Sequence, residues 1–218
     1  MYARHLAMFG LLCVSTSMGR SESAPPANSE VEVYLKGEAG SSADILAEMN
    51  RELAALMQQT SFRLIWRHAN DGFSGGGAAH LIVVELRGDC AVPSSYDPSQ
   101  PVVTSMALAS TSVVDGKVLP FSWVDCSALS RFLGPAISTL PDAEQTHVYG
   151  RSMARLLAHE FYHVLAQTDD HTLLGLSKAR FSTADLLADH FDFEAAALDK
   201  LRPPSPGASG DDPSVGGR

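Results

Sequence analysis

The sequence is short of positive charge, of cysteine and of long apolar runs. Its 16 Lys and Arg residues are outnumbered by 25 Asp and Glu residues, and they form no cluster. A nucleic-acid surface needs a basic footprint, so we expect no nucleic-acid partner. No segment reaches the roughly 20 apolar residues that cross a bilayer, so we expect no stable membrane insertion. A P-loop, a dinucleotide-binding fingerprint and a serine-nucleophile elbow are also absent.

The first 23 residues have the pattern of a secretory signal peptide. Arg4 and His5 give a positive start, residues 6–14 (LAMFGLLCV) are apolar, and small residues follow. This order is typical of a cleaved signal, and the apolar part is too short for a membrane anchor. We therefore expect residues 1–23 to be removed and the mature protein to be secreted or periplasmic.

Two further segments bound the folded part of the chain. Residues 24–29 (APPANS) have the composition of an extended linker, and residues 202–218 are rich in Pro, Gly, Ser and Asp. The latter segment has little apolar surface to bury, so we expect a disordered tail at 202–218. One domain over residues 30–200 is long enough to enclose a substantial core.

Only three cysteines are present, and Cys13 lies within the expected signal peptide. Export would leave Cys90 and Cys126, an even number in an oxidising compartment. We expect a disulfide between them, and the alternative is a pair of buried reduced thiols.

Hydrophobic periodicity predicts an α+β domain. Apolar alternation or short apolar runs predict strands at 30–35, 62–67, 80–86, 105–114 and 117–124, the last two joined by an Asp115-Gly116 hairpin turn. Apolar residues at helical spacing predict helices at 42–58, at 141–167 and from Ser182 to about Leu198. Segments 71–77 and 93–101 are expected loops. This order indicates a mixed sheet backed by two helices, with a small helical part at the C-terminal end.

The segment His159-Glu160-Phe161-Tyr162-His163 lies within the expected helix 141–167. Histidines four residues apart stack on one helical face, so both rings can direct a nitrogen at one Zn²⁺ about 2.0–2.1 Å away. Glu160 can reach a water on the metal without binding the metal itself, which suits a general base. We therefore expect zinc as the cofactor, His159 and His163 as ligands, and Glu160 as the catalytic residue.

A catalytic zinc needs a third protein ligand and one open position. The candidates are His171, then Asp169, and last a carboxylate of the final helix, namely Asp185, Asp189 or Glu194. We favour His171, because imidazole is the commonest nitrogen ligand of zinc and residues 168–170 favour a turn after the helix. We expect three imidazole nitrogens within about 4 Å of one another, with Asp169 directed outward or toward a ligand ring.

The run HEFYHVLAQTDDH resembles the active-site helix of the zincin metallopeptidases, and among them the metzincin pattern H-E-x-x-H-x-x-G-x-x-H. Ala166 stands where that pattern has glycine, Asp169 stands at its third-ligand position, and no methionine after Met153 can supply a Met-turn. The pieces GLSKA (175–179) and STADL (182–186) are similar to a set of uncharacterised bacterial exported proteins, which supports His171. The resemblance implies a zincin-like fold in which an edge strand, here within 105–124, binds an extended substrate.

These expectations combine into an exported zinc metallopeptidase that cleaves a protein or peptide substrate with a zinc-bound water activated by Glu160. The alternative is a zincin-fold protein that binds zinc or a partner without turnover. Glu160 separates the two, because a purely structural site does not need it. Near the site, we expect His147 to lie off the metal-facing stripe, Tyr162 to pack in the core and Lys178 to form a surface ion pair.

Overall fold

The computed structural model of the chain describes residues 29–37, 41–68, 80–92 and 107–202. The expected signal peptide (1–23), the expected loops 71–77 and 93–101, and residues 203–218 of the expected tail lie outside the described residues. Residues 105 and 106, the start of the fourth expected strand, do so as well. Within the described ranges, no helix is long and apolar enough to cross a membrane.

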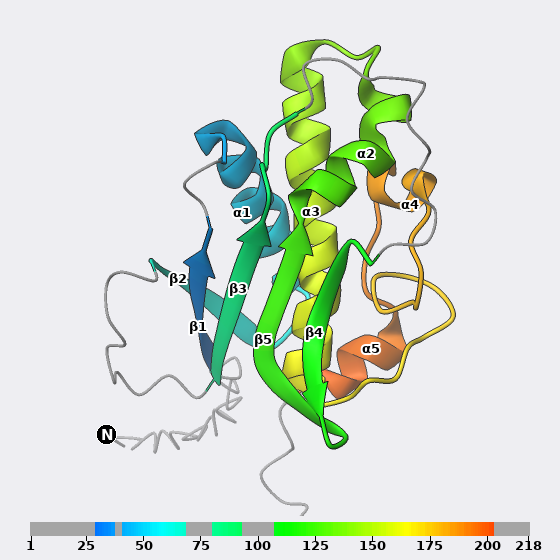
Figure 1. Cartoon of the computed structure of the whole chain (residues 1–218). Helices are drawn as coiled ribbons and strands as arrows, with labels where there is room; N and C mark the ends of the chain where they lie inside the picture. Colours follow the sequence, from blue (N-terminus) through cyan, green and yellow to red (C-terminus); the bar gives the residue numbers. More distant parts are fainter. Residues whose placement is uncertain (1–28, 38–40, 69–79, 93–106, 203–218) are drawn as a thin grey trace, which may run out of the picture.

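A five-stranded mixed sheet forms one layer of the domain (Figure 1). The strand order is β2-β1-β3-β5-β4, and the bounds are β1 Ser29–Lys36, β2 Phe62–His68, β3 His80–Arg87, β4 Ala109–Val114 and β5 Lys117–Asp125. Strand β1 runs parallel to β2 and β3, and β3 runs parallel to β5, whereas β4 pairs antiparallel with β5. The expected mixed sheet is confirmed, and β4 forms one of its two edges.

The turn between β4 and β5 is the expected hairpin turn. Asp115 and Gly116 both have positive φ, 51° and 72°. Positive φ at both central residues is typical of a type I′ turn, whose twist matches the twist of the paired strands. Asp-Gly is one of the residue pairs that favour this turn.

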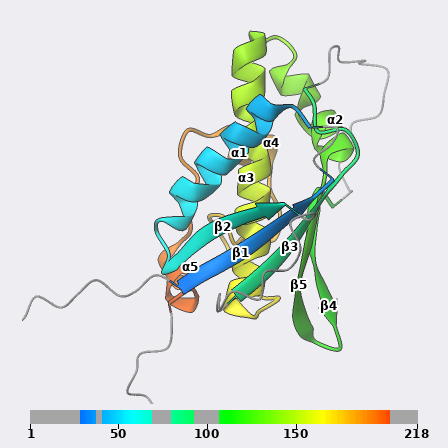
Figure 2. The same ribbon diagram turned by 90° about the vertical axis from the view of Figure 1, so that its left-hand side faces the viewer.

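Five helices complete the described part of the α+β domain. Their bounds are α1 Ala43–Met57, α2 Cys126–Ile137, α3 Asp142–Ala166, α4 Thr183–Leu187 and α5 Ala195–Lys200. Helices α1 and α3 lie side by side against one face of the sheet, as Figures 1 and 2 show. Almost every residue of α3 from Val148 to Val164 is buried, so α3 is the central helix of the core.

The structure differs from the sequence-based expectations at two helical segments. No helix was expected at 126–137, where the structure has α2 with Pro135 inside it. A usable signal was Asp125, whose side chain accepts the Ala128 backbone N–H at 2.8 Å and caps α2. The single helix expected from Ser182 to Leu198 is instead α4 and α5, separated by residues 188–194.

The break between α4 and α5 has a packing reason. In the segment between them, Phe193 is buried in the core and Phe191 packs against it, with the Phe181 and Phe191 rings 5.4 Å apart. Phe191 and Phe193 are two residues apart, and a continuous helix would place their rings on different faces, so both could not pack into the core. Helix α4 begins with a capping box, since Ser182 and Asp185 each bond to the other's backbone N–H.

Cys90 and Cys126 form the expected disulfide, which joins the segment after β3 to the first residue of α2. Both cysteines are fully buried. In the chain-entropy model, closing a loop of 36 residues stabilises the fold by about 4 kcal/mol.

Gly150 allows α3 to approach α1 closely. A Cβ added at Gly150 would lie 2.5 Å from the Glu48 Cβ, 2.8 Å from the Ile45 carbonyl oxygen and 3.1 Å from the Met49 backbone nitrogen. Backbone atoms cannot move aside as a flexible side chain can. The glycine that weakens the helix by propensity is therefore required by packing.

We expect Gly150→Ala to destabilise the protein, although Ala is the better helix former by about 0.8–1 kcal/mol. Forcing α1 and α3 apart should lower the free energy of unfolding by about 1–3 kcal/mol, measured by urea denaturation. The reverse change at an exposed position of α3, Ala143→Gly, should cost up to about 1 kcal/mol through propensity alone. A Gly150→Ala protein as stable as the parent would contradict the packing account.

Candidate metal centre

Two buried histidines on α3 meet through their outer ring nitrogens. His159 and His163 are 9% and 7% exposed, and they lie one helical turn apart on the same face of α3. Their Nε2 atoms are 3.0 Å apart. Two nitrogens bound to one tetrahedral ion at about 2.0–2.1 Å are about 3.3–3.4 Å apart, so this separation is close to that of a shared ligand pair.

Backbone carbonyls determine where the two rings carry their protons. The Nδ1 of His159 lies 2.7 Å from the Leu176 carbonyl oxygen, and the Nδ1 of His163 lies 2.7 Å from that of Thr168. A carbonyl oxygen only accepts, so each Nδ1 must donate its N–H. In the neutral rings each Nε2 then has a lone pair, and the two lone pairs point toward each other.

The two rings are neutral near pH 7. Burial lowers the pKa of His159 to about 4, and burial also lowers the pKa of His163, with the hydrogen bond to Thr168 and the charge of Asp169 opposing that shift. No proton is therefore shared between the facing Nε2 atoms. A cation bound by both nitrogens would relieve the repulsion of their lone pairs, and the donor set fits a metal ion for this reason.

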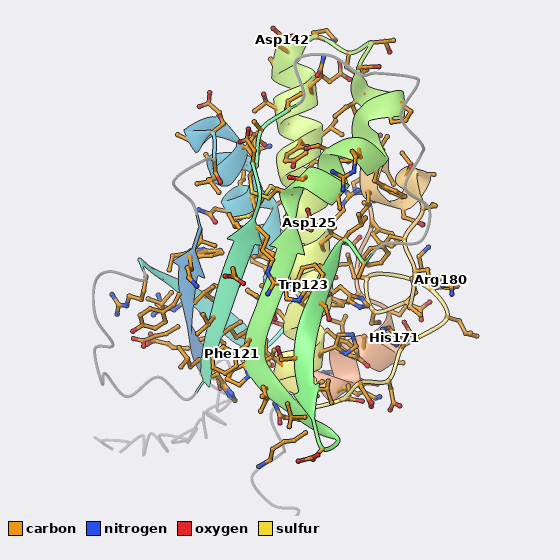
Figure 3. All side chains as sticks on the ribbon, in the orientation of Figure 1. Phe121, Trp123, Asp125, Asp142, His171 and Arg180 are labelled. Carbon is orange, nitrogen blue, oxygen red and sulfur yellow. A yellow bond between two sulfur atoms is a disulfide. The ribbon has the colours of Figure 1, made fainter. Side chains whose placement is uncertain are left out.

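His171 completes the cluster from the loop after α3, where Figure 3 labels it. One ligand atom from each of His159, His163 and His171 can be chosen so that all lie within 4.8 Å of one another. This limit is somewhat wider than the expected separation of about 4 Å. The His171 ring centroid lies 5.2 Å from that of His159 and 4.8 Å from that of His163. The three histidines could hold a metal ion, with two of them buried and His171 exposed.

The chain reverses toward the cluster without glycine at position 166. Ala166 is still helical, and Gln167 takes the left-handed conformation at φ 49° and ψ 46°. The Thr168 N–H then donates to the His163 carbonyl at 3.2 Å, which closes the helix end. The left-handed residue is therefore Gln167, and His171 follows it by four residues.

The loop that follows His171 is braced and also supports His159. Thr172 donates its backbone N–H to the Ser177 carbonyl at 2.9 Å, and the hydroxyls of Thr172 and Ser177 are 2.7 Å apart. Leu176 and Ser177 are fully buried, and the Leu176 carbonyl receives the His159 N–H. The sequence did not reveal these carbonyls, because every residue has one and only the fold aims it.

Glu160 follows His159 on α3 and is buried, but it is not part of the histidine cluster. Thr111, on the edge strand β4, donates to the Glu160 Oε2 at 2.7 Å. Burial raises the pKa of Glu160 to about 7, against the opposing effect of this hydrogen bond. No Lys or Arg among the residues with assigned structure forms an ion pair with it. The sequence did not point to Thr111, which comes from a strand 49 residues earlier.

The carboxylates that were considered as ligands lie elsewhere. Asp169 is exposed and outside the cluster, although its charge reaches His163. Asp185 caps α4, and its carboxylate forms an ion pair with Lys178 at 2.7 Å. Asp189 is exposed, and Glu194 precedes α5 as its N-cap residue. The structure thus brings His171, and none of these acids, to His159 and His163.

Three further polar residues that were weighed in the sequence lie outside the histidine cluster. His147 lies 2.8 Å from the Glu48 carboxylate on α1, away from the cluster. Tyr162 is buried, with its ring 6.5 Å from that of Phe193. Lys178 forms the ion pair with Asp185 and is mostly buried. These positions agree with the expectations for His147 and Tyr162, while the Lys178 pair is less exposed than a surface pair.

Comparison with known proteins gives no family for the chain: no family model matches it, and no curated protein matches it significantly. The functional interpretation therefore depends on the geometry of this site.

We expect His159→Ala, His163→Ala and His171→Ala each to abolish tight binding of a divalent ion, since each removes one candidate ligand. The matched control is His147→Ala, a histidine of α3 outside the cluster. Each protein is given one equivalent of zinc, dialysed, and analysed for metal content. Stoichiometric zinc in His159→Ala or His163→Ala would refute the site. Retention in His171→Ala together with loss in Asp169→Ala would assign the third ligand to Asp169.

Proposed function

We propose that the protein is an exported zinc metallopeptidase of the zincin type. The observation that carries the proposal is the convergence of His159, His163 and His171, together with the burial of Glu160, the residue that follows His159 on α3. Three imidazoles with an open position are the ligand set of catalytic rather than structural zinc.

Zinc is the metal that this donor set favours. The three candidate ligands are all nitrogens, whereas calcium and magnesium are bound by oxygen. The carbonyls of Leu176 and Thr168 bond to the far nitrogens of His159 and His163, an arrangement that orients zinc-binding imidazoles in other proteins. When bound, the ion would polarise the substrate carbonyl and acidify a coordinated water.

Glu160 is proposed as the general base. Its carboxylate accepts a proton from the attacking water as the new C–O bond forms, and returns it to the amine nitrogen when the C–N bond breaks. The bond from Thr111 holds one carboxylate oxygen in a fixed direction. A neighbouring cation would lower the pKa of Glu160 and make it a weaker base. No Lys or Arg in the described part of the chain forms an ion pair with it.

The substrate is proposed to be an extended peptide laid along β4. This strand is an edge of the sheet and carries Thr111, which touches Glu160. The outer side of an edge strand has backbone N–H and C=O groups that can pair with another extended chain. Such pairing recognises the peptide backbone and so fits a protein or peptide substrate.

Export is proposed from two independent features. The first 23 residues have the pattern of a signal peptide, and the domain has a buried disulfide between Cys90 and Cys126. Disulfides persist in oxidising compartments, which is where a cleaved signal would deliver the chain.

We expect Glu160→Gln to lower the rate of casein or peptide cleavage by at least about hundredfold while leaving bound zinc unchanged. Gln keeps the size of the side chain and cannot accept the proton. The matched control is Glu144→Gln, in the exposed first turn of α3, which should leave the rate unchanged. Zinc bound stoichiometrically without cleavage of any tested protein would instead support the non-catalytic zinc-binding alternative.

A further inference from the structure

The sheet is irregular at the point where β4 passes Glu160. Thr111 pairs with Ser122 and Val113 pairs with Val118, so one residue of β4 faces three of β5, residues 119–121. Pro120 lies among the three, and proline within a sheet is found at edges and bulges because it has no N–H to donate. Bulges redirect the side chains next to them. The regular pair that adjoins this bulge is Thr111 and Ser122.

This pair of hydroxyls faces α3. The Thr111 Oγ1 lies 2.7 Å from the Glu160 Oε2, 3.2 Å from the Glu160 carbonyl oxygen and 2.9 Å from the Ser122 Oγ. Ser122 is only 3% exposed, while its neighbours Phe121 and Trp123, labelled in Figure 3, alternate to the other face of the sheet. Two strands thus contribute one hydroxyl each to the buried surface around Glu160.

The direction of each hydrogen bond follows from the groups involved. Once Glu160 is ionised, as it must be to act as a base, its carboxylate only accepts, and Thr111 then donates its single hydroxyl proton to Glu160. Thr111 then has no proton for Ser122, so Ser122 must donate to the Thr111 Oγ1. The result is a directed chain from Ser122 to Thr111 to Glu160, in which each bond polarises the next.

We propose that Thr111 is a positioning residue for Glu160 and that Ser122 supports it through this chain. The inference rests on the proposed function, in which Glu160 is the general base. Thr111 belongs to the edge strand along which the peptide is proposed to lie, so the strand that receives the substrate also holds the base. A peptide seated on β4 is thereby aligned with Glu160 through a single residue.

The activity test compares Thr111→Val, which keeps the shape and removes the donor, with Thr111→Ser, which keeps the donor. We expect Thr111→Val to lower kcat about tenfold with KM and zinc content little changed, and Thr111→Ser to restore most of the rate. The matched control is Thr146→Val, a threonine near the start of α3 and outside the histidine cluster, which should behave as the parent. An unchanged kcat in Thr111→Val, or no rescue by Thr111→Ser, would overturn the proposal.

Ser122→Ala gives a second route should Thr111→Val fold poorly. It leaves the Thr111–Glu160 bond in place and removes only the supporting donor. We expect a smaller loss of kcat than in Thr111→Val, again with bound zinc unchanged. A Ser122→Ala protein with the kinetics of the parent would contradict the directed chain.

A double-mutant cycle on stability tests the same contact without any activity. Unfolding by urea is measured above pH 8, where Glu160 is ionised, for the metal-free parent, Thr111→Val, Glu160→Gln and the double variant. We expect Thr111→Val to lower the folding equilibrium constant in the parent and in the Glu160→Gln background, with a loss about tenfold larger in the parent. The reason is that a hydrogen bond to a charged acceptor is stronger than one to a neutral amide. Equal effects in both backgrounds would overturn the Thr111 proposal. Coupling without any peptide cleavage would support the contact and reject the proposed function.

Discussion

Two hydrogen bonds from histidine rings to backbone carbonyls determine the character of the site. Because the Leu176 and Thr168 carbonyls take the Nδ1 protons of His159 and His163, both Nε2 lone pairs turn inward, 3.0 Å apart. The carbonyls belong to the segment that returns from α3, so the same turn that orients these rings also delivers His171. The left-handed Gln167 makes this reversal possible, at a steric cost that glycine would avoid.

The rest of the fold fixes the position of α3 relative to this returning segment. Gly150 lets α1 lie close against α3, and the buried Arg155 ties α3 to two other elements: it bonds to Glu52 on α1 at 3.2 Å and to the Leu186 carbonyl of α4 at 2.8 Å. The disulfide fastens α2 to the segment that follows β3. On the other side of α3, the edge strand β4 reaches Glu160 through Thr111. The candidate site is thus held between a rigid helix, a braced loop and a sheet edge.

The sequence was informative where a pattern repeats locally. The four-residue spacing of His159 and His163, the Asp115-Gly116 turn and the capping box at Ser182 each follow from chemistry within a few residues. It was uninformative where distant segments decide the outcome. No helix was expected at α2, which contains Gly134 and Pro135 and is held by the residues that it buries. The last expected helix is interrupted where Phe193 is buried. Thr111 could not be found, because its role exists only once β4 is placed beside α3.

X-ray absorption at the zinc edge, on the chain without its expected signal peptide, tests the central claim most directly. The account predicts one zinc per chain, with three imidazole nitrogens and one oxygen at about 2.0–2.1 Å. His171→Ala should reduce the imidazole contribution from three rings to two in whatever zinc remains bound. A chain that takes up no zinc, or a shell that contains sulfur at about 2.3 Å or four protein ligands, would contradict it.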